Sequence, residues 1–84
     1  MASGGFRLSR LRLLPYRDLR RVAERAGFTW VRCVGSHNTF RADDGRIVVI
    51  PDHGSRVIVR PLLRRILRDL GLTPETYERV LKTL

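Results

Sequence analysis

The hydrophobic positions along the chain first follow a helical period, then short extended runs, then a helical period again. After Pro15, a residue that suits the first turn of a helix, apolar residues recur at helical spacing until Gly27. Arginines fill most of the opposite side, so we predict an amphipathic helix over residues 16–26. The apolar stripe of this helix consists of Tyr16, Leu19, Val22, Ala23 and Ala26.

Three short segments rich in β-branched and aromatic residues follow, and residues that favour turns separate them. We predict strands over 28–34, 37–42 and 46–50. Gly35-Ser36 forms the first turn, and Asp43-Asp44-Gly45 is a typical hairpin turn because glycine readily adopts a positive φ. A meander of three antiparallel strands is the simplest arrangement of these segments.

Alternation along the strands predicts which side chains face the core, because successive strand residues point to opposite faces. Phe40 should point into the core, and strict alternation in the first strand adds Val31 and Cys33. The open face should then carry His37, Thr39 and Arg41 from the second strand and Trp30 and Arg32 from the first.

Two further helices are predicted after an irregular loop. One begins at Arg60-Pro61 and ends at Gly71, and a short C-terminal helix follows an N-cap at Thr73 with Pro74 in its first turn. We therefore predict an α+β fold: a three-stranded antiparallel sheet with helices packed on one face, in the order of a double-stranded-RNA-binding domain, plus the C-terminal helix. Residues 1–14 should form a partly flexible N-terminal arm, and residues 15–84 a single domain.

Charge and composition limit the classes of partner and cofactor that the protein can have. Lys and Arg total 17 against 8 Asp and Glu, a net charge of +9, which predicts a polyanionic partner and nucleic acid first. One cysteine and two histidines predict no disulfide and no metal site, and 84 residues leave little room for a small-molecule cofactor. No apolar run is long enough to span a membrane, so we expect a cytoplasmic protein without a membrane partner.

The segment from Ala26-Gly27-Phe28 through Gly35-Ser36-His37 to the histidine and glycine after Pro51 resembles the HicA family of toxin ribonucleases. The resemblance covers roughly residues 14–78, and its Gly-Ser-His stands where the family has it, opening the second strand. It implies a type II toxin–antitoxin toxin that cleaves mRNA without a metal, with a HicB-type antitoxin as partner. Its active-site histidine corresponds to His37, with Gly35 and Ser36 shaping the turn. The chain departs from the family pattern at Arg60-Pro61-Leu62 and in its longer N-terminal arm.

The chemistry of His37 agrees with this expectation. Metal-free RNA cleavage needs a proton acceptor and a proton donor, and imidazole can serve as either near neutral pH. Arg32 and Arg41 can bind phosphate and Trp30 can stack on a base, while His53 is a candidate for a second proton-transfer or substrate-orienting group. Each residue also has a purely structural interpretation: a polar turn residue for His37, a loop residue for His53 and a partly buried core residue for Trp30.

Two other functions fit parts of the sequence. A non-catalytic RNA-binding module explains the element order and the charge but gives Gly35-Ser36-His37 no role. A DNA-binding helix-turn-helix can be drawn over residues 63–84, but Glu75 and Glu78 in its second helix would repel phosphate.

Overall fold

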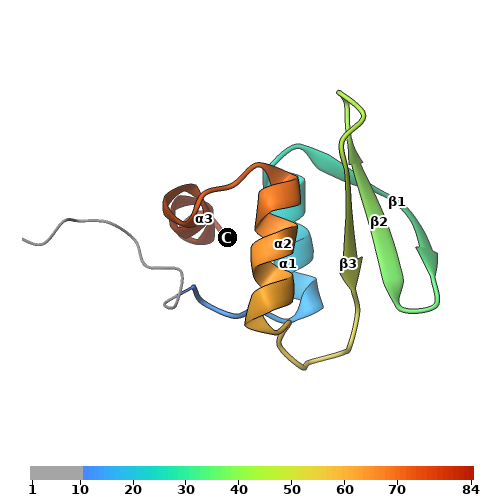
Figure 1. The fold of residues 1–84 in the computed structure, drawn as a ribbon, viewed down its shortest axis with the longest axis horizontal. Helices are drawn as coiled ribbons and strands as arrows, with labels where there is room; N and C mark the ends of the chain where they lie inside the picture. The colour runs from blue at the N-terminus through green and yellow to red at the C-terminus, as the bar shows by residue number, and fades with distance from the viewer. Residues whose placement is uncertain (1–10) are drawn as a thin grey trace, which may run out of the picture.

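A computed structural model describes residues 11–84 of the chain. It contains three helices and three strands in the order predicted from the sequence (Figure 1). The elements are α1 (Tyr16–Arg25), β1 (Phe28–Val34), β2 (His37–Ala42), β3 (Ile47–Pro51), α2 (Arg60–Leu70) and α3 (Pro74–Leu81). The predicted α+β fold is confirmed, and the third strand differs only by starting and ending one residue later.

The sheet is an antiparallel meander in which β2 lies between β1 and β3. Its central strand alternates as predicted: Asn38, Phe40 and Ala42 are buried, whereas His37 and Arg41 are exposed. The buried side chains face the helices, so the exposed ones mark the open face of the sheet.

A β-bulge interrupts β1 at Val31 and changes which of its side chains face the helices. Trp30 pairs with Phe40, and the register then shifts so that Arg32 pairs with Thr39. Paired residues on neighbouring antiparallel strands share a face. Trp30 therefore lies on the side of the helices, while Arg32 lies on the open face as predicted.

Two parts of the sequence prediction for β1 are wrong. Val31 and Cys33 were expected in the core, but both are exposed. Trp30 was expected on the open face, but it faces the other way. A bulge inserts one extra residue, so strict alternation fails across it, and this accounts for Trp30 and Val31. Cys33 pairs with the buried Asn38 and so lies on the side of the helices as predicted, but its side chain is exposed near the end of the strand.

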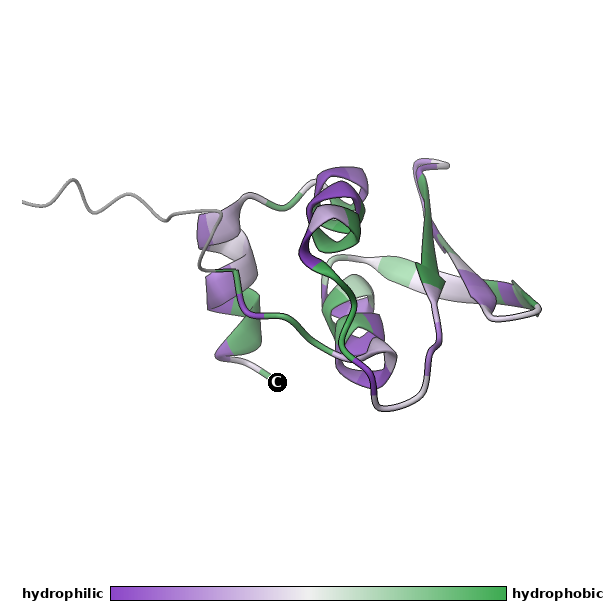
Figure 2. Ribbon diagram, turned by 60° about the horizontal axis from the view of Figure 1, so that its bottom comes forward, coloured by the Kyte–Doolittle hydropathy of each residue, from purple (hydrophilic) through white to green (hydrophobic). Residues whose placement is uncertain are grey.

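The core lies between the sheet and the helices. α1 packs against β1 and β3, α2 packs against β3, and α3 packs on α1 away from the sheet (Figure 1). Figure 2 shows hydrophobic residues on the facing sides of α1 and α2 and hydrophilic residues on their outer sides. The most deeply buried side chains of these elements include Leu19 and Val22 of α1, Phe40 and Ile50 of the sheet, and Leu63 and Ile66 of α2. Among the described residues, no helix is long and apolar enough to cross a membrane.

Residues 11–14 are docked on the domain. Leu11 and Leu14 are buried, the Arg60 guanidinium donates to the Leu11 carbonyl at 2.8 Å, and the Ile58 N–H donates to the Leu14 carbonyl at 2.9 Å. The predicted partly flexible arm spans residues 1–14, and residues 1–10 lie outside the described part of the chain.

The cap of α3 is built from two threonines. The Thr73 hydroxyl accepts from the Thr76 N–H at 3.1 Å, and the Thr76 hydroxyl accepts from the Thr73 N–H at 2.8 Å. This reciprocal pair satisfies two backbone donors that a helix start leaves free. Tyr77 is fully buried one turn further on and donates its hydroxyl proton to the Arg12 carbonyl at 2.6 Å, so α3 holds the docked arm.

Candidate active site

The Gly35-Ser36 turn places His37 at the first position of the central strand. Gly35 has a φ of +60°, a conformation that favours glycine over residues with a side chain. The Ser36 carbonyl accepts from the Asp52 N–H at 2.7 Å, which ties the turn to the end of β3. His37 itself is exposed and lies between Val34 of β1 and Pro51 of β3. A backbone fixed from both sides therefore presents a solvent-accessible imidazole.

Asn38 anchors this turn from inside the protein, and the sequence analysis did not identify it. Its side chain is only 6% exposed and is the one buried polar residue within 11–84. Its carbonyl oxygen accepts from the Trp30 indole N–H at 2.9 Å, and its amide group donates to the Ser36 carbonyl at 3.4 Å. The signal was present in the sequence: Asn38 has the same strand parity as Phe40, so a polar side chain stands at a core position.

Two predicted arginines share the open face with His37 at different separations. Arg32 lies opposite Thr39, which makes it a diagonal neighbour of His37, at about 7–8 Å between backbone positions. Arg41 is four residues further along β2, at a distance of about 13 Å along an extended strand. The backbone position of Arg32 is therefore the nearer of the two to that of His37.

Trp30 does not join this patch, contrary to the sequence prediction. Its side chain is 49% exposed and, with Tyr16, Asn38 and Asp52, lines a separate hollow on the side of the helices. Burial raises the pKa of the Tyr16 phenol in the same hollow. In this position the indole supports Asn38, and a base stacked on it would lie on the opposite side of the sheet from Arg32.

His53 lies two residues beyond the end of β3 and is exposed. Its loop is shaped by the Asp52 carboxylate, which accepts from the Gly54 N–H at 2.9 Å. His53 does not line the groove that contains His37. Its role in the reaction stays a prediction.

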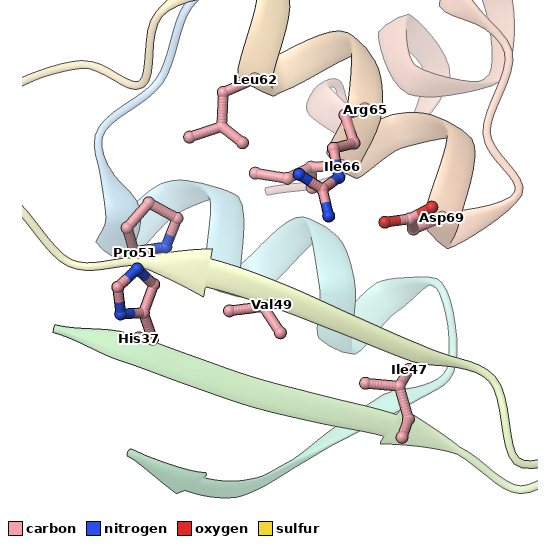
Figure 3. A pocket seen from close by; sticks show the side chains of 8 residues that line it. All are labelled: His37, Ile47, Val49, Pro51, Leu62, Arg65, Ile66 and Asp69. Carbon is pink, nitrogen blue, oxygen red and sulfur yellow. The ribbon is translucent and has the colours of Figure 1, made fainter. Parts of the chain in front are cut away.

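A groove of about 430 Å³ runs along β3, and His37 and Pro51 lie together at one end of it (Figure 3). Its apolar lining consists of Ile47, Val49, Pro51, Leu62 and Ile66, and its polar lining consists of His37, Arg65 and Asp69. The α2 residues could not be placed beside His37 from sequence, because their position depends on how α2 packs against the edge strand. Within residues 11–84, no three His, Cys, Asp or Glu residues are grouped as a metal site would require.

The fold and this site define a small basic α+β domain with an exposed histidine in a tightly held turn. Residues 16–72, more than half of the chain, match the family described as HicA toxin of bacterial toxin–antitoxin systems. The chain therefore belongs to the HicA toxin family and is a toxin component of such a system, which implies an antitoxin partner. The matched region includes the Gly35-Ser36-His37 turn and both walls of the groove. A search of curated proteins finds no match to this chain.

Proposed function

We propose that this toxin is a metal-independent endoribonuclease that cleaves mRNA and that His37 is its catalytic residue. The observation that carries the proposal is the exposed imidazole at the end of a groove, on a turn held by the Ser36–Asp52 backbone hydrogen bond. A general acid or base must be accessible to the RNA yet fixed in position. The His37 side chain is accessible, and the backbone turn that carries it is held in place.

The reaction we propose is attack of a ribose 2′-oxygen on the adjacent phosphorus. The new O–P bond forms as the bond from phosphorus to the 5′-oxygen of the next nucleotide breaks. His37 makes one of the two proton transfers, either accepting the 2′-hydroxyl proton or donating a proton to the departing 5′-oxygen, and solvent water makes the other. The products are a 2′,3′-cyclic phosphate and a 5′-hydroxyl, and no redox partner is needed.

The charge of the chain supports an RNA substrate. The net charge is +9, and the open face that carries His37 also carries Arg32, its diagonal neighbour, and Arg41 further along β2. Neither arginine forms an ion pair with an acidic residue of the described chain, so both remain free to bind phosphate. Gly35 and Ser36 contribute backbone N–H groups near the same place, where they can help to bind the charged phosphate.

The proposed antitoxin is a HicB-type protein with an acidic surface. The simplest way to silence the toxin is to cover the cationic face around His37. Complementary charge would also speed association of the two proteins. We expect this partner to bind the open face of the sheet.

Cleavage of an end-labelled RNA by the purified protein tests the proposal. We expect fragments with 2′,3′-cyclic phosphate and 5′-hydroxyl ends, formed at the same rate with and without a metal chelator. Fragments with a 5′-phosphate, or loss of cleavage in the chelator, would contradict the mechanism. Tight RNA binding without any cleavage would favour the non-catalytic RNA-binding module.

A further inference from the structure

The groove along β3 contains apolar and charged side chains that proton transfer by His37 does not require. One wall is the outward side of β3, where Ile47 is 55% and Val49 is 41% exposed. The other wall is α2, and Figure 3 shows the side chain of Arg65 extending from this helix toward β3, with the Asp69 carboxylate beside it. The groove therefore combines an apolar lining with the Arg65 guanidinium, the Asp69 carboxylate and, at one end, the His37 imidazole.

Arg65 has no partner in the part of the chain that the structure describes. The ion pairs there are Arg20–Glu24, Arg46–Asp44 and Arg79–Glu75, and none involves Arg65. Asp69 is one helical turn away and still does not pair with it. A guanidinium that is exposed, unpaired and directed into a groove is suited to bind an anion from outside, and its planar donors match the oxygens of a phosphate.

The apolar lining of the groove favours a flat organic group next to the phosphate that Arg65 is suited to bind. Val49, Pro51 and Leu62 line the same groove as His37 and Arg65. The groove volume of about 430 Å³ lies within the usual range for small-ligand sites, which is roughly 300–1,000 Å³. A nucleotide supplies both a flat base and a phosphate, and the Asp69 carboxylate can accept a hydrogen bond from a base amino or imino group.

We propose that this groove binds one nucleotide of the RNA next to the bond that is cleaved, with Arg65 on its phosphate and its base against Val49 and Leu62. The proposal rests on the proposed function, because it takes RNA as the substrate of His37. It names Arg65 as an RNA-binding residue on a helix rather than on the sheet. It also makes the groove, and Asp69 in particular, a source of base preference.

The test separates binding from cleavage by using an RNA that cannot react. A ten-nucleotide 2′-fluoro RNA of random sequence lacks the attacking 2′-hydroxyl, and its affinity can be measured by fluorescence anisotropy. We expect Arg65→Gln to weaken binding about tenfold, as loss of one charge-assisted contact would. The slope of log affinity against log salt should fall by about 0.7, the value for one phosphate on a single strand. Arg65→Lys, which keeps the charge, should recover part of the affinity.

Arg64→Gln is the matched control, because Arg64 is the adjacent exposed arginine of α2 and lines a different hollow. It removes the same charge from the same helix, and we expect it to change affinity less than twofold. Leu62→Trp, which fills the groove without altering charge, should weaken binding as Arg65→Gln does. Equal effects of Arg65→Gln and Arg64→Gln, or no effect of Leu62→Trp, would overturn the proposal.

The outcomes also distinguish this proposal from the proposed function. If the wild-type protein cleaves unmodified RNA but the two glutamine variants bind 2′-fluoro RNA alike, the groove proposal fails and the ribonuclease function stands. If the wild-type protein binds RNA through Arg65 but cleaves nothing, the ribonuclease function fails, and the groove is an RNA-binding site with no cleaved bond beside it. If Arg65→Gln weakens only the antitoxin complex, the groove is a protein-binding surface and the nucleotide site is wrong.

Discussion

The hydrogen bond between Trp30 and Asn38 should stabilise the fold and position the turn that carries His37. The indole N–H donates to the Asn38 carbonyl oxygen at 2.9 Å, and the same side chain donates to the Ser36 carbonyl. Asn38→Ala removes both contacts from a residue that is only 6% exposed. Trp30→Phe removes the donor and leaves the Asn38 oxygen without that partner.

The expected loss of stability depends on which groups lose a hydrogen-bond partner. A hydrogen bond of this kind contributes about 0.5–1.5 kcal/mol net. Ser36 keeps the Asp52 N–H as a partner after Asn38→Ala, so most of the loss comes from the indole contact. We expect Asn38→Ala to lower the free energy of unfolding by about 1–2 kcal/mol, and the melting temperature by about 4–8 °C for each kcal/mol.

A double-mutant cycle on the free energy of unfolding isolates the pair. Asn38→Ala and Trp30→Phe should show a coupling energy of about 1 kcal/mol. Thr29→Ala is the control, because Thr29 adjoins Trp30 but lies on the opposite face, so its effect should add to that of Asn38→Ala. A coupling below about 0.3 kcal/mol between Asn38 and Trp30 would refute the reasoning. Since the turn carries His37, Asn38→Ala should also lower kcat for RNA cleavage about tenfold or more, with KM nearly unchanged.

Three further predictions concern the arm, the substrate and the partner. The Tyr77 hydroxyl donates to the Arg12 carbonyl, and burial raises the pKa of this phenol, so the donor stays protonated further into the alkaline range. Removing this hydrogen bond by Tyr77→Phe should lower stability by about 1 kcal/mol in thermal unfolding, and an unchanged melting temperature would contradict this. RNA affinity should fall steeply with salt: each phosphate neutralised should contribute about 0.7 to the slope of log affinity against log salt concentration. An affinity that does not change with salt concentration would contradict electrostatic binding. In the antitoxin complex His37 should be protected from diethylpyrocarbonate, with Arg32 and Arg41 screened; modification as fast as in the free toxin would show that the antitoxin leaves the histidine uncovered.

Most of the fold could be predicted from sequence, because its signals are local. Pro15 and Gly27 flank α1, Gly71 follows α2, and Thr73 caps α3. These residues act through their own backbone geometry, so neighbouring sequence is enough to recognise them. The open-face positions of His37 and Arg41 were predicted for the same reason, since β2 alternates without interruption.

The errors and omissions at the site come from contacts between distant segments. The bulge at Val31 depends on how β1 pairs with β2, and it moved Trp30 to the side of the helices. Arg65 reaches the groove only because α2 packs against β3. No pattern in the local sequence predicts this packing. Asn38 could have been found, because a polar residue at a core position needs hydrogen-bond partners.

The most direct test of the account is the rate of RNA cleavage by the wild type and by His37→Ala at matched thermal stability. Removing an exposed side chain should change the free energy of unfolding by only about 0.5 kcal/mol, so the variant should fold. Loss of a proton-transfer group should slow cleavage by roughly a hundredfold to ten-thousandfold. The variant should also be non-toxic on expression and still bind the antitoxin. Equal rates for the two proteins would contradict the assignment of His37 and make His53 the next residue to test.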